Sequence, residues 1–161
     1  MAYLDWEKSY VGQLRKKIGN DVLIVPTVRA VIPNAQGEVL FIRRSDDGGW
    51  GMPAGSIELH ESISDCLRRE VWEETGLEVI KAIPMAIYSE PRFAFTTCFG
   101  GKHQMFSIVF IVTDWVGQLK TQTEETIDAQ FFSLTELPPI PVLYQETLQD
   151  YQEFEGTLVL K

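Results

Sequence analysis

The sequence predicts an α/β domain, and three observations carry the prediction. Segments rich in β-branched and aromatic residues alternate along the chain with segments whose apolar residues recur every three or four positions. Two of the β-rich segments, 77–88 and 104–114, are apolar on both faces, which is typical of a buried central sheet. The chain has 161 residues, of which 45% are hydrophobic, so one compact domain is expected.

Composition excludes several classes of function. A formal net charge of −9 argues against a protein that binds nucleic acid or an anionic membrane, because both attractions require clustered Lys and Arg. The two cysteines do not resemble a disulfide framework, and the first residues contain neither a signal peptide nor a membrane span. We therefore expect a cytoplasmic protein.

The first elements are a helix and two strands. Residues 4–18 carry Leu4, Val11, Leu14 and Ile18 at helical spacing, and Gly19 and Asn20 would end that helix. We expect residues 1–20 to form an N-terminal helix that packs on the domain or on a partner subunit, and residues 21–161 to form the single domain. Segments 22–32 and 38–42 flank a turn-like sequence and are predicted to pair as adjacent antiparallel strands.

A glycine-rich loop, 45–55, leads into a helix predicted over 62–75. Ser62 followed by Asp65 resembles a capping box, and Gly76 suits the left-handed residue that ends a helix. The four-residue spacing of Ile63, Leu67 and Val71 predicts the stripe that docks on the sheet.

The later elements alternate again. After the strand 77–88, residues 89–102 contain Phe93, Phe95 and Phe99, which form either a loop capping the core or a wall of a ligand pocket. The strand 104–114 precedes a polar loop and a short strand, 129–134. Residues 137–141 include three prolines, and a last helix is expected over 142–154.

The helix 62–75 also carries chemistry. Glu70, Glu73 and Glu74 are three or four residues apart, so their carboxylates crowd one side of its last turns. Mutual repulsion and the helix dipole both disfavour that cluster. Oxygen-only ligands suit Mg²⁺ or Mn²⁺, which would supply the missing charge. The alternative is a solvated helix end whose acids pair with Arg68, Arg69 or Lys81.

The segment 55–77 reads GSIELHESISDCLRREVWEETGL and resembles the Nudix box, G-x5-E-x7-R-E-U-x-E-E-x-G-U, at every specified position. Such agreement is expected by chance on the order of once in ten million chains of this length. The resemblance implies an α/β/α sandwich with a mixed sheet. It also implies a metal-dependent hydrolase in which water attacks a phosphorus of a nucleoside diphosphate derivative.

The resemblance implies roles for individual residues. Glu70, Glu73 and Glu74 would bind metal together with the carbonyl oxygen of Ala54. Arg69 would pair with Glu61 or Glu73 and fix its direction, and Gly55 would make the tight turn beside the metal. Gly76, which would end the helix, is also counted among the residues that support the metal site.

Roles outside the box are less constrained. Glu125 is the favoured general base, with Glu124 next, although an ordinary polar loop and a base within the box are the alternatives. Arg43, Arg44 and Phe93 are candidate substrate contacts. A Nudix-fold sensor that binds a nucleotide or ADP-ribose without turnover is the alternative function, and a homodimer is a further expectation from the family. The sequence does not name the substrate.

Overall fold

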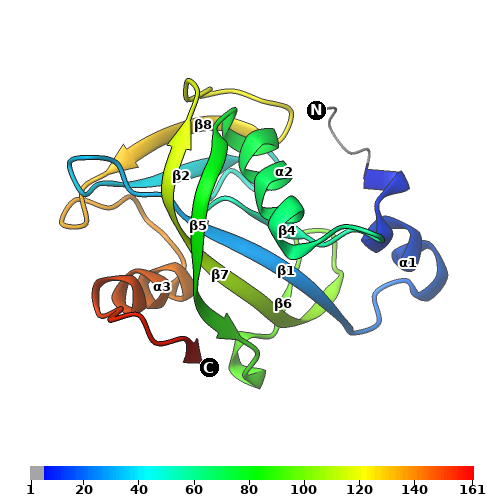
Figure 1. Cartoon of the computed structure of the whole chain (residues 1–161). Coiled ribbons are helices and arrows are strands. Elements are labelled where there is room, and N and C mark those ends of the chain that lie inside the picture. The colour runs from blue at the N-terminus through cyan, green and yellow to red at the C-terminus, as the bar shows by residue number, and fades with distance from the viewer. Residues whose placement is uncertain (1–5) are drawn as a thin grey trace.

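The computed structural model describes residues 6–161, and their elements form two sheets and three α-helices (Figure 1). The larger sheet has the order β4-β1-β7-β5-β9, with β6 also paired to β7, and the smaller has the order β3-β2-β8. The strands of the larger sheet are β1 (Leu23–Val31), β4 (Ala54–Ser56), β5 (Glu78–Tyr88), β6 (Phe95–Thr96), β7 (Lys102–Val116) and β9 (Val159–Leu160). Those of the smaller sheet are β2 (Val39–Arg44), β3 (Trp50–Gly51) and β8 (Thr126–Phe132).

The larger sheet is mixed, as predicted. The strand β1 runs parallel to β7 and antiparallel to β4, while β5 is antiparallel to β7 and parallel to β9. In β1, Val28 and Ala30 belong to one core cluster with α2 (Ile63–Thr75), as does Ile32 just after the strand, and Val31 belongs to another with α3 (Val142–Gln152). The two helices therefore cover opposite faces of the sheet, which makes the predicted α/β/α sandwich (Figure 1).

The predicted antiparallel pairing of β1 with β2 is wrong. An isolated bridge between Pro33 and Val39 and one hydrogen bond from Leu40 N to Ile32 O link their ends. Beyond this bridge the strands diverge, because β1 pairs with β7 whereas β2 pairs with β8 along its whole length. The turn at 33–38 thus joins two sheets instead of closing a hairpin.

The N-terminal helix is shorter than predicted. A 3-10 turn, η1 (Trp6–Lys8), precedes α1 (Tyr10–Ile18), whose first turn is capped by the Ser9 side chain accepting a hydrogen bond from Gly12 N. The cap starts the helix at Tyr10, and the predicted start at Leu4 lies outside the described residues. The helix contacts the domain where the Tyr10 amide donates to the Glu58 carboxylate.

The ends of other elements also differ from expectation. The strand β8 lies three residues earlier than predicted at its start, α3 ends at Gln152, and the two-residue strands β3, β6 and β9 and the three-residue strand β4 were not predicted. The loop after β5 contains the 3-10 turn η2 (Pro91–Phe93). Within residues 6–161, no helix is both long enough and apolar enough to cross a membrane.

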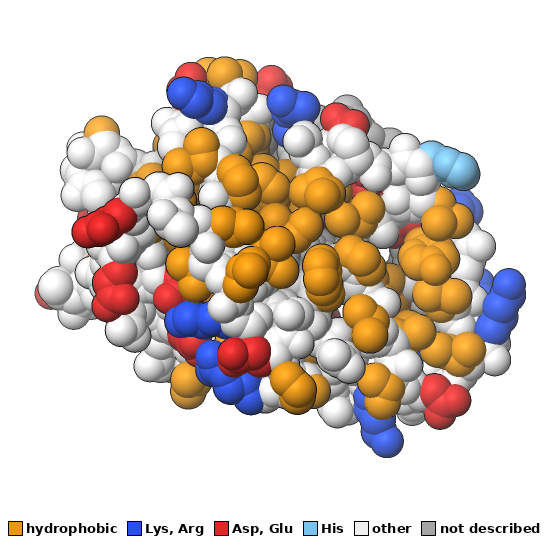
Figure 2. Space-filling view, turned by 60° about the horizontal axis from the view of Figure 1, so that its bottom comes forward, with side chains coloured by type: hydrophobic (Ala, Val, Ile, Leu, Met, Phe, Trp, Pro, Cys, Tyr) orange, Lys and Arg blue, Asp and Glu red, His pale blue; other side chains and the backbone are white. Residues whose placement is uncertain are grey.

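One face of the molecule is strongly apolar. Figure 2 shows hydrophobic side chains gathered over the face that lies at the bottom of Figure 1, where β1, β6 and β9 lie. Exposed large residues of these strands include Ile24, Phe95 and Leu160, which are 61%, 44% and 71% exposed. An apolar surface of this kind is typical of a contact surface.

Candidate active site

The helix α2 begins and ends where the sequence predicts. Ser62 accepts a hydrogen bond from Asp65 N at the start, and Gly76 takes the left-handed conformation at the end, with φ 72°. Leu67 and Val71 are buried as expected, but Ile63 is 42% exposed. The buried face passes through Cys66 instead, so the first residue of the predicted stripe lies outside the docked face.

The acidic end of α2 is buried, which rules out the solvated helix end considered as an alternative. Glu70 is 7% exposed, and Glu73 and Glu74 are each 1% exposed. Arg68 lies on the outer side of the helix and pairs with Asp65 at 3.6 Å. Buried carboxylates require a partner, because desolvation of an ion costs several kcal/mol.

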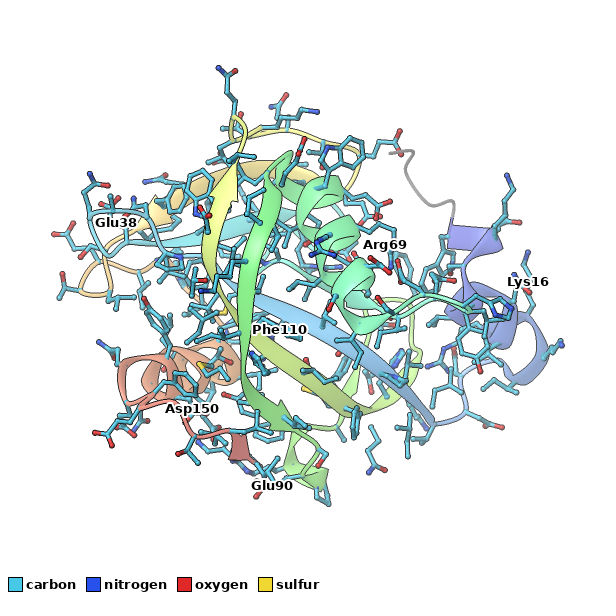
Figure 3. All side chains as sticks on the ribbon, in the orientation of Figure 1. Lys16, Glu38, Arg69, Glu90, Phe110 and Asp150 are labelled. Carbon is cyan, nitrogen blue, oxygen red and sulfur yellow. The ribbon has the colours of Figure 1, made fainter. Side chains whose placement is uncertain are left out.

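Arg69 is the cation within this cluster. Its Nε and Nη2 donate to the two carboxylate oxygens of Glu61 at 2.7 and 2.9 Å. Its Nη1 donates to Glu70 Oε1 at 2.7 Å and to Glu73 Oε2 at 3.0 Å. Figure 3 labels Arg69 on the side of α2 that faces the preceding loop. These bonds hold the pKa of Glu61 below its ordinary value although burial acts to raise it.

The turn before α2 fits closely against its acids. The Ala54 amide donates to Glu74 Oε2 at 2.9 Å, and this bond ties β4 to the end of the helix. A Cβ at Gly55 would lie 1.9 Å from the Glu70 carboxyl carbon, so a side chain at this position would displace the Glu70 carboxylate. The glycine therefore leaves room for Glu70 beside the turn.

The cluster holds more negative charge than Arg69 can balance. Burial, the largest cause, raises the pKa of Glu70 to about 7 although Arg69 opposes the rise. Burial followed by repulsion from Glu70 raises the pKa of Glu74 well above its ordinary value. The pKa of Glu125 is also raised, first by burial and then by repulsion from Glu73.

The donor chemistry fits a divalent cation. Glu73 Oε1 is buried without any hydrogen-bond partner, so one carboxylate oxygen in the cluster is free to bind an ion. As the side chains are placed, no group of three or more His, Cys, Asp or Glu in residues 6–161 is arranged to hold a metal. Arg69 and the Ala54 amide occupy the other oxygens described above. Carboxylate oxygens are the ligands that Mg²⁺ and Mn²⁺ favour.

The three predicted substrate contacts lie in different surroundings. Arg44, at the end of β2, is 3.9 Å from Glu74 Oε1 and forms a two-bond pair with Asp46 at 3.0 and 2.8 Å. Arg43 is exposed and donates to the Gly48 carbonyl. Phe93 is 7% exposed and stacks on Tyr88 in the core that α3 covers, so its position is that of a core-capping residue.

The loop before β8 brings Glu125 to the cluster. The Glu125 carbonyl accepts a hydrogen bond from Ser45 N, just beyond β2, and the pairing of β2 with β8 fixes this loop beside the box. Its carboxylate is close enough to raise the pKa of Glu70 and Glu74. Glu124, the second candidate, has its carbonyl near the Ser45 hydroxyl at 3.4 Å.

Two residues beside this site were not foreseen. Arg29 of β1 pairs with Ala54 across the sheet, and Tyr144 of α3 approaches Gly51, where a Cβ would lie 2.9 Å from its hydroxyl. The available signal for Arg29 was that it is the one charged residue in the segment 22–32. Nothing in the sequence indicates that Tyr144 reaches the glycine-rich loop.

Comparisons with known proteins agree with this geometry. The model of the NUDIX domain matches residues 23–151. The ADP-ribose pyrophosphatase of Methanocaldococcus jannaschii is 29% identical over 74% of this chain and 68% of its own length. An NAD-capped RNA hydrolase, NudC, of Pseudomonas aeruginosa is 35% identical over 65% of this chain and 34% of its own length.

In several curated relatives, including the MutT-like protein of Streptomyces ambofaciens, the matched part is only about a third of the relative's length. The crystal structure of a MutT protein from Methanosarcina mazei is 28% identical, with a TM-score of 0.63 over 83% of this chain and 96% of that one. A complete box, its buried acids and a family match along most of the chain lead to one conclusion: this protein belongs to the Nudix hydrolase family.

Proposed function

We propose that this chain hydrolyses the diphosphate linkage of a nucleoside diphosphate derivative with the help of a divalent cation, Mg²⁺ or Mn²⁺. The observation that carries the proposal is the buried acid cluster, in which Glu73 Oε1 has no partner and one arginine serves several carboxylates. Further positive charge would lower the cost of keeping these buried carboxylates ionised.

The residues that would hold the cation are Glu70, Glu73 and Glu74, with the carbonyl oxygen of Ala54. When bound, the cation would neutralise diphosphate oxygens and lower the pKa of the attacking water. Arg69 would position Glu70 and Glu73 through its hydrogen bonds, as residues outside the metal's own ligands do in other sites.

The remaining chemistry falls to residues around the cluster. A water oxygen forms a bond to one phosphorus, the bond from that phosphorus to the bridging oxygen breaks, and the bridging oxygen leaves on the second phosphate. Glu125 would accept the proton of the water, since its raised pKa suits a general base. Arg44 would contact a phosphate oxygen, because its guanidinium already lies 3.9 Å from Glu74.

The names of the relatives suggest a range of substrates. One is an ADP-ribose pyrophosphatase and another an NAD-capped RNA hydrolase, and both names describe adenosine-containing diphosphates. Because one relative is named for a capped RNA, our expectation that this protein does not bind nucleic acid stays a prediction. A test panel therefore needs ADP-ribose, nucleotide sugars, nucleoside triphosphates, dinucleoside polyphosphates and an NAD-capped RNA.

The test is phosphate release from this panel, coupled to a phosphatase, with Mg²⁺, with Mn²⁺ and with a chelator. Metal-dependent cleavage of one class would support the proposal and name the substrate. Folded protein that binds ADP-ribose yet cleaves nothing would contradict it and favour the sensor function.

We further propose a homodimer that forms through the apolar face in Figure 2. The exposed apolar side chains of β1 and β9 include Ile24 and Leu160. Light scattering measures the mass directly, and a species of one chain's 18.3 kDa at micromolar concentration would contradict the dimer. The cytoplasmic location stays a prediction.

A further inference from the structure

A buried arginine, Arg29, lies on the opposite face of the larger sheet from α2. Arg29 is 4% exposed, and within residues 6–161 its side chain makes one hydrogen bond, from Nη1 to the Thr147 hydroxyl at 3.1 Å. Its Nε is buried without a partner. Within residues 6–161 the charged state of Arg29 is favoured only by two tyrosines, and no carboxylate contributes.

Aromatic rings replace the missing carboxylate. The Arg29 guanidinium lies 4.9 Å from the ring centre of Tyr144 and 5.9 Å from that of Tyr88. Cation–π contacts of this kind recover only part of the solvation that a buried cation loses. Burial accordingly lowers the pKa of Arg29, which shows that the folded protein destabilises the charged form.

The strand that carries Arg29 lies beside the acid cluster, although the guanidinium itself is on the other face of the sheet. Arg29 lies opposite Ala54 in the β1–β4 pairing, and Ala54 donates to Glu74. Tyr144 lies between the two regions, since the Arg29 guanidinium is 4.9 Å from the centre of its ring and its hydroxyl is the atom nearest a Cβ placed at Gly51. A substrate whose diphosphate lies at the acids would therefore meet Arg29 with a part that extends past Tyr144 to the α3 face.

We propose that Arg29 is a specificity residue, whose Nε and Nη2 bind two neighbouring hydrogen-bond acceptors on the nucleotide substrate. Nη1 is already bound to Thr147, so the edge formed by Nε and Nη2 is the one left for a ligand. This edge presents two parallel N–H groups, which match two oxygens of a phosphate or the O6 and N7 atoms of guanine. Tyr144, which is half-buried, covers the guanidinium and would move aside or stack on the ligand.

The inference rests on the proposed function for the identity of the ligand, but its test does not require turnover. Calorimetric titration in the presence of a chelator measures the binding of GDP, ADP, UDP and inorganic pyrophosphate. The variants are Arg29→Met and Arg29→Lys, and Arg68→Met, which removes an exposed arginine on the outer face of α2, is the matched control.

We expect Arg29→Met to lose at least about tenfold in affinity for the recognised probes. We also expect its Tm to rise, because an apolar side chain of similar length replaces an uncompensated buried cation. Arg29→Lys keeps the charge but lacks the paired N–H groups, so the same loss of affinity is expected. Arg68→Met should bind every probe as the unaltered protein does.

The pattern of losses identifies the acceptor. Loss confined to GDP would assign Arg29 to the base, and equal loss for all probes, pyrophosphate included, would assign it to phosphate. Affinities within twofold of the unaltered protein for both Arg29 variants would overturn the inference, as would wild-type affinity of Arg29→Lys alone. Binding that depends on Arg29 without any hydrolysis would refute the proposed function and leave this inference standing.

Discussion

Arg69, which is partly buried, and Arg29, which is buried, make an informative comparison. Arg69 touches Glu61, Glu70 and Glu73 and has more carboxylates around it than it can neutralise. Arg29, across the sheet, has Thr147 and two tyrosine rings as neighbours and, among residues 6–161, no carboxylate partner. The acid cluster has more negative than positive charge, and the Nε of Arg29 lacks a hydrogen-bond acceptor.

A nucleotide bound together with a divalent cation would supply both. The cation would complete the acid cluster, and an acceptor on the nucleotide would complete Arg29. Each region alone is costly to the folded protein, because buried charge without a full complement of partners is destabilising. The comparison therefore suggests that both were selected for binding and not for stability.

The largest expected effect is on turnover, at the acidic region. Glu74→Gln removes a charge that the cation needs while keeping the bond from the Ala54 amide, so metal-dependent turnover should fall about a thousandfold with the fold intact. Steady-state kinetics measure the turnover, and circular dichroism shows whether the variant is folded. Wild-type turnover would remove Glu74 from the proposed metal ligands.

The next effect is on stability, and it separates the two arginines directly. Arg69→Met leaves buried carboxylates without their cation and should lower the free energy of unfolding by about 3 kcal/mol. Arg29→Met should change it in the opposite direction. Urea unfolding of both variants, with Arg68→Met as the exposed control, measures the difference, and equal destabilisation by both would contradict the contrast.

A steric change tests the geometry of the acidic region without altering charge. In Gly55→Ala, the new Cβ would overlap the Glu70 carboxylate, so Glu70 must move and activity should fall on the order of a hundredfold. Gly49→Ala is the control, because only the flexible Asp47 side chain lies near its Cβ, at 3.2 Å. If both variants keep full activity, the position of Glu70 is not critical.

The smallest effect comes from an ion-pair cluster on α3, where Glu146 accepts bonds from Arg92 and Lys161. The bonds from Arg92, and then those from Lys161, lower the pKa of Glu146 to about 2. A lowered carboxyl pKa stabilises the fold above the unfolded pKa of about 4.3, and the stabilisation disappears as the pH falls toward 2.

Glu146→Gln should therefore cost less than about 1 kcal/mol at pH 6, and the difference should shrink below pH 4. Thermal unfolding of both proteins over this range is the measurement. A difference that stays constant down to pH 2.5 would show that the cost has another origin.

The sequence predicts a structural feature well when the residues that determine the feature lie close together along the chain. The ends of α2 follow from Ser62 and Gly76, which act within a few residues, and both were predicted. The partner of β1 is β7, roughly eighty residues later in the register, and no turn chemistry encodes that pairing. The hairpin-like turn at 33–38 misled the prediction because turn sequences describe a reversal and not the sheet that each strand joins.

The residues of the site fall into the same two groups, those placed by a continuous motif and those brought together by the tertiary fold. The box acids, Arg69 and Gly55 form a continuous motif, so the sequence places them together, and their burial follows from the docking of α2. Glu125 was chosen from its position before a late strand, and its charge does act on the cluster. Arg29 and Tyr144 converge from β1 and α3. Their juxtaposition requires the tertiary fold, and neither belongs to the motif.

The division of the strands into two sheets has a mechanical meaning for this enzyme. Arg44 and Glu125 are carried by the smaller sheet, at the end of β2 and the start of β8, whereas the acids of α2 are docked on the larger one. The two sheets share one core, in which Leu40 and Ile42 of β2 pack with Val28 and Ala30 of β1. The packing between the sheets therefore sets the 3.9 Å separation of Arg44 and Glu74, so that a substitution in this shared core would alter the site without touching it.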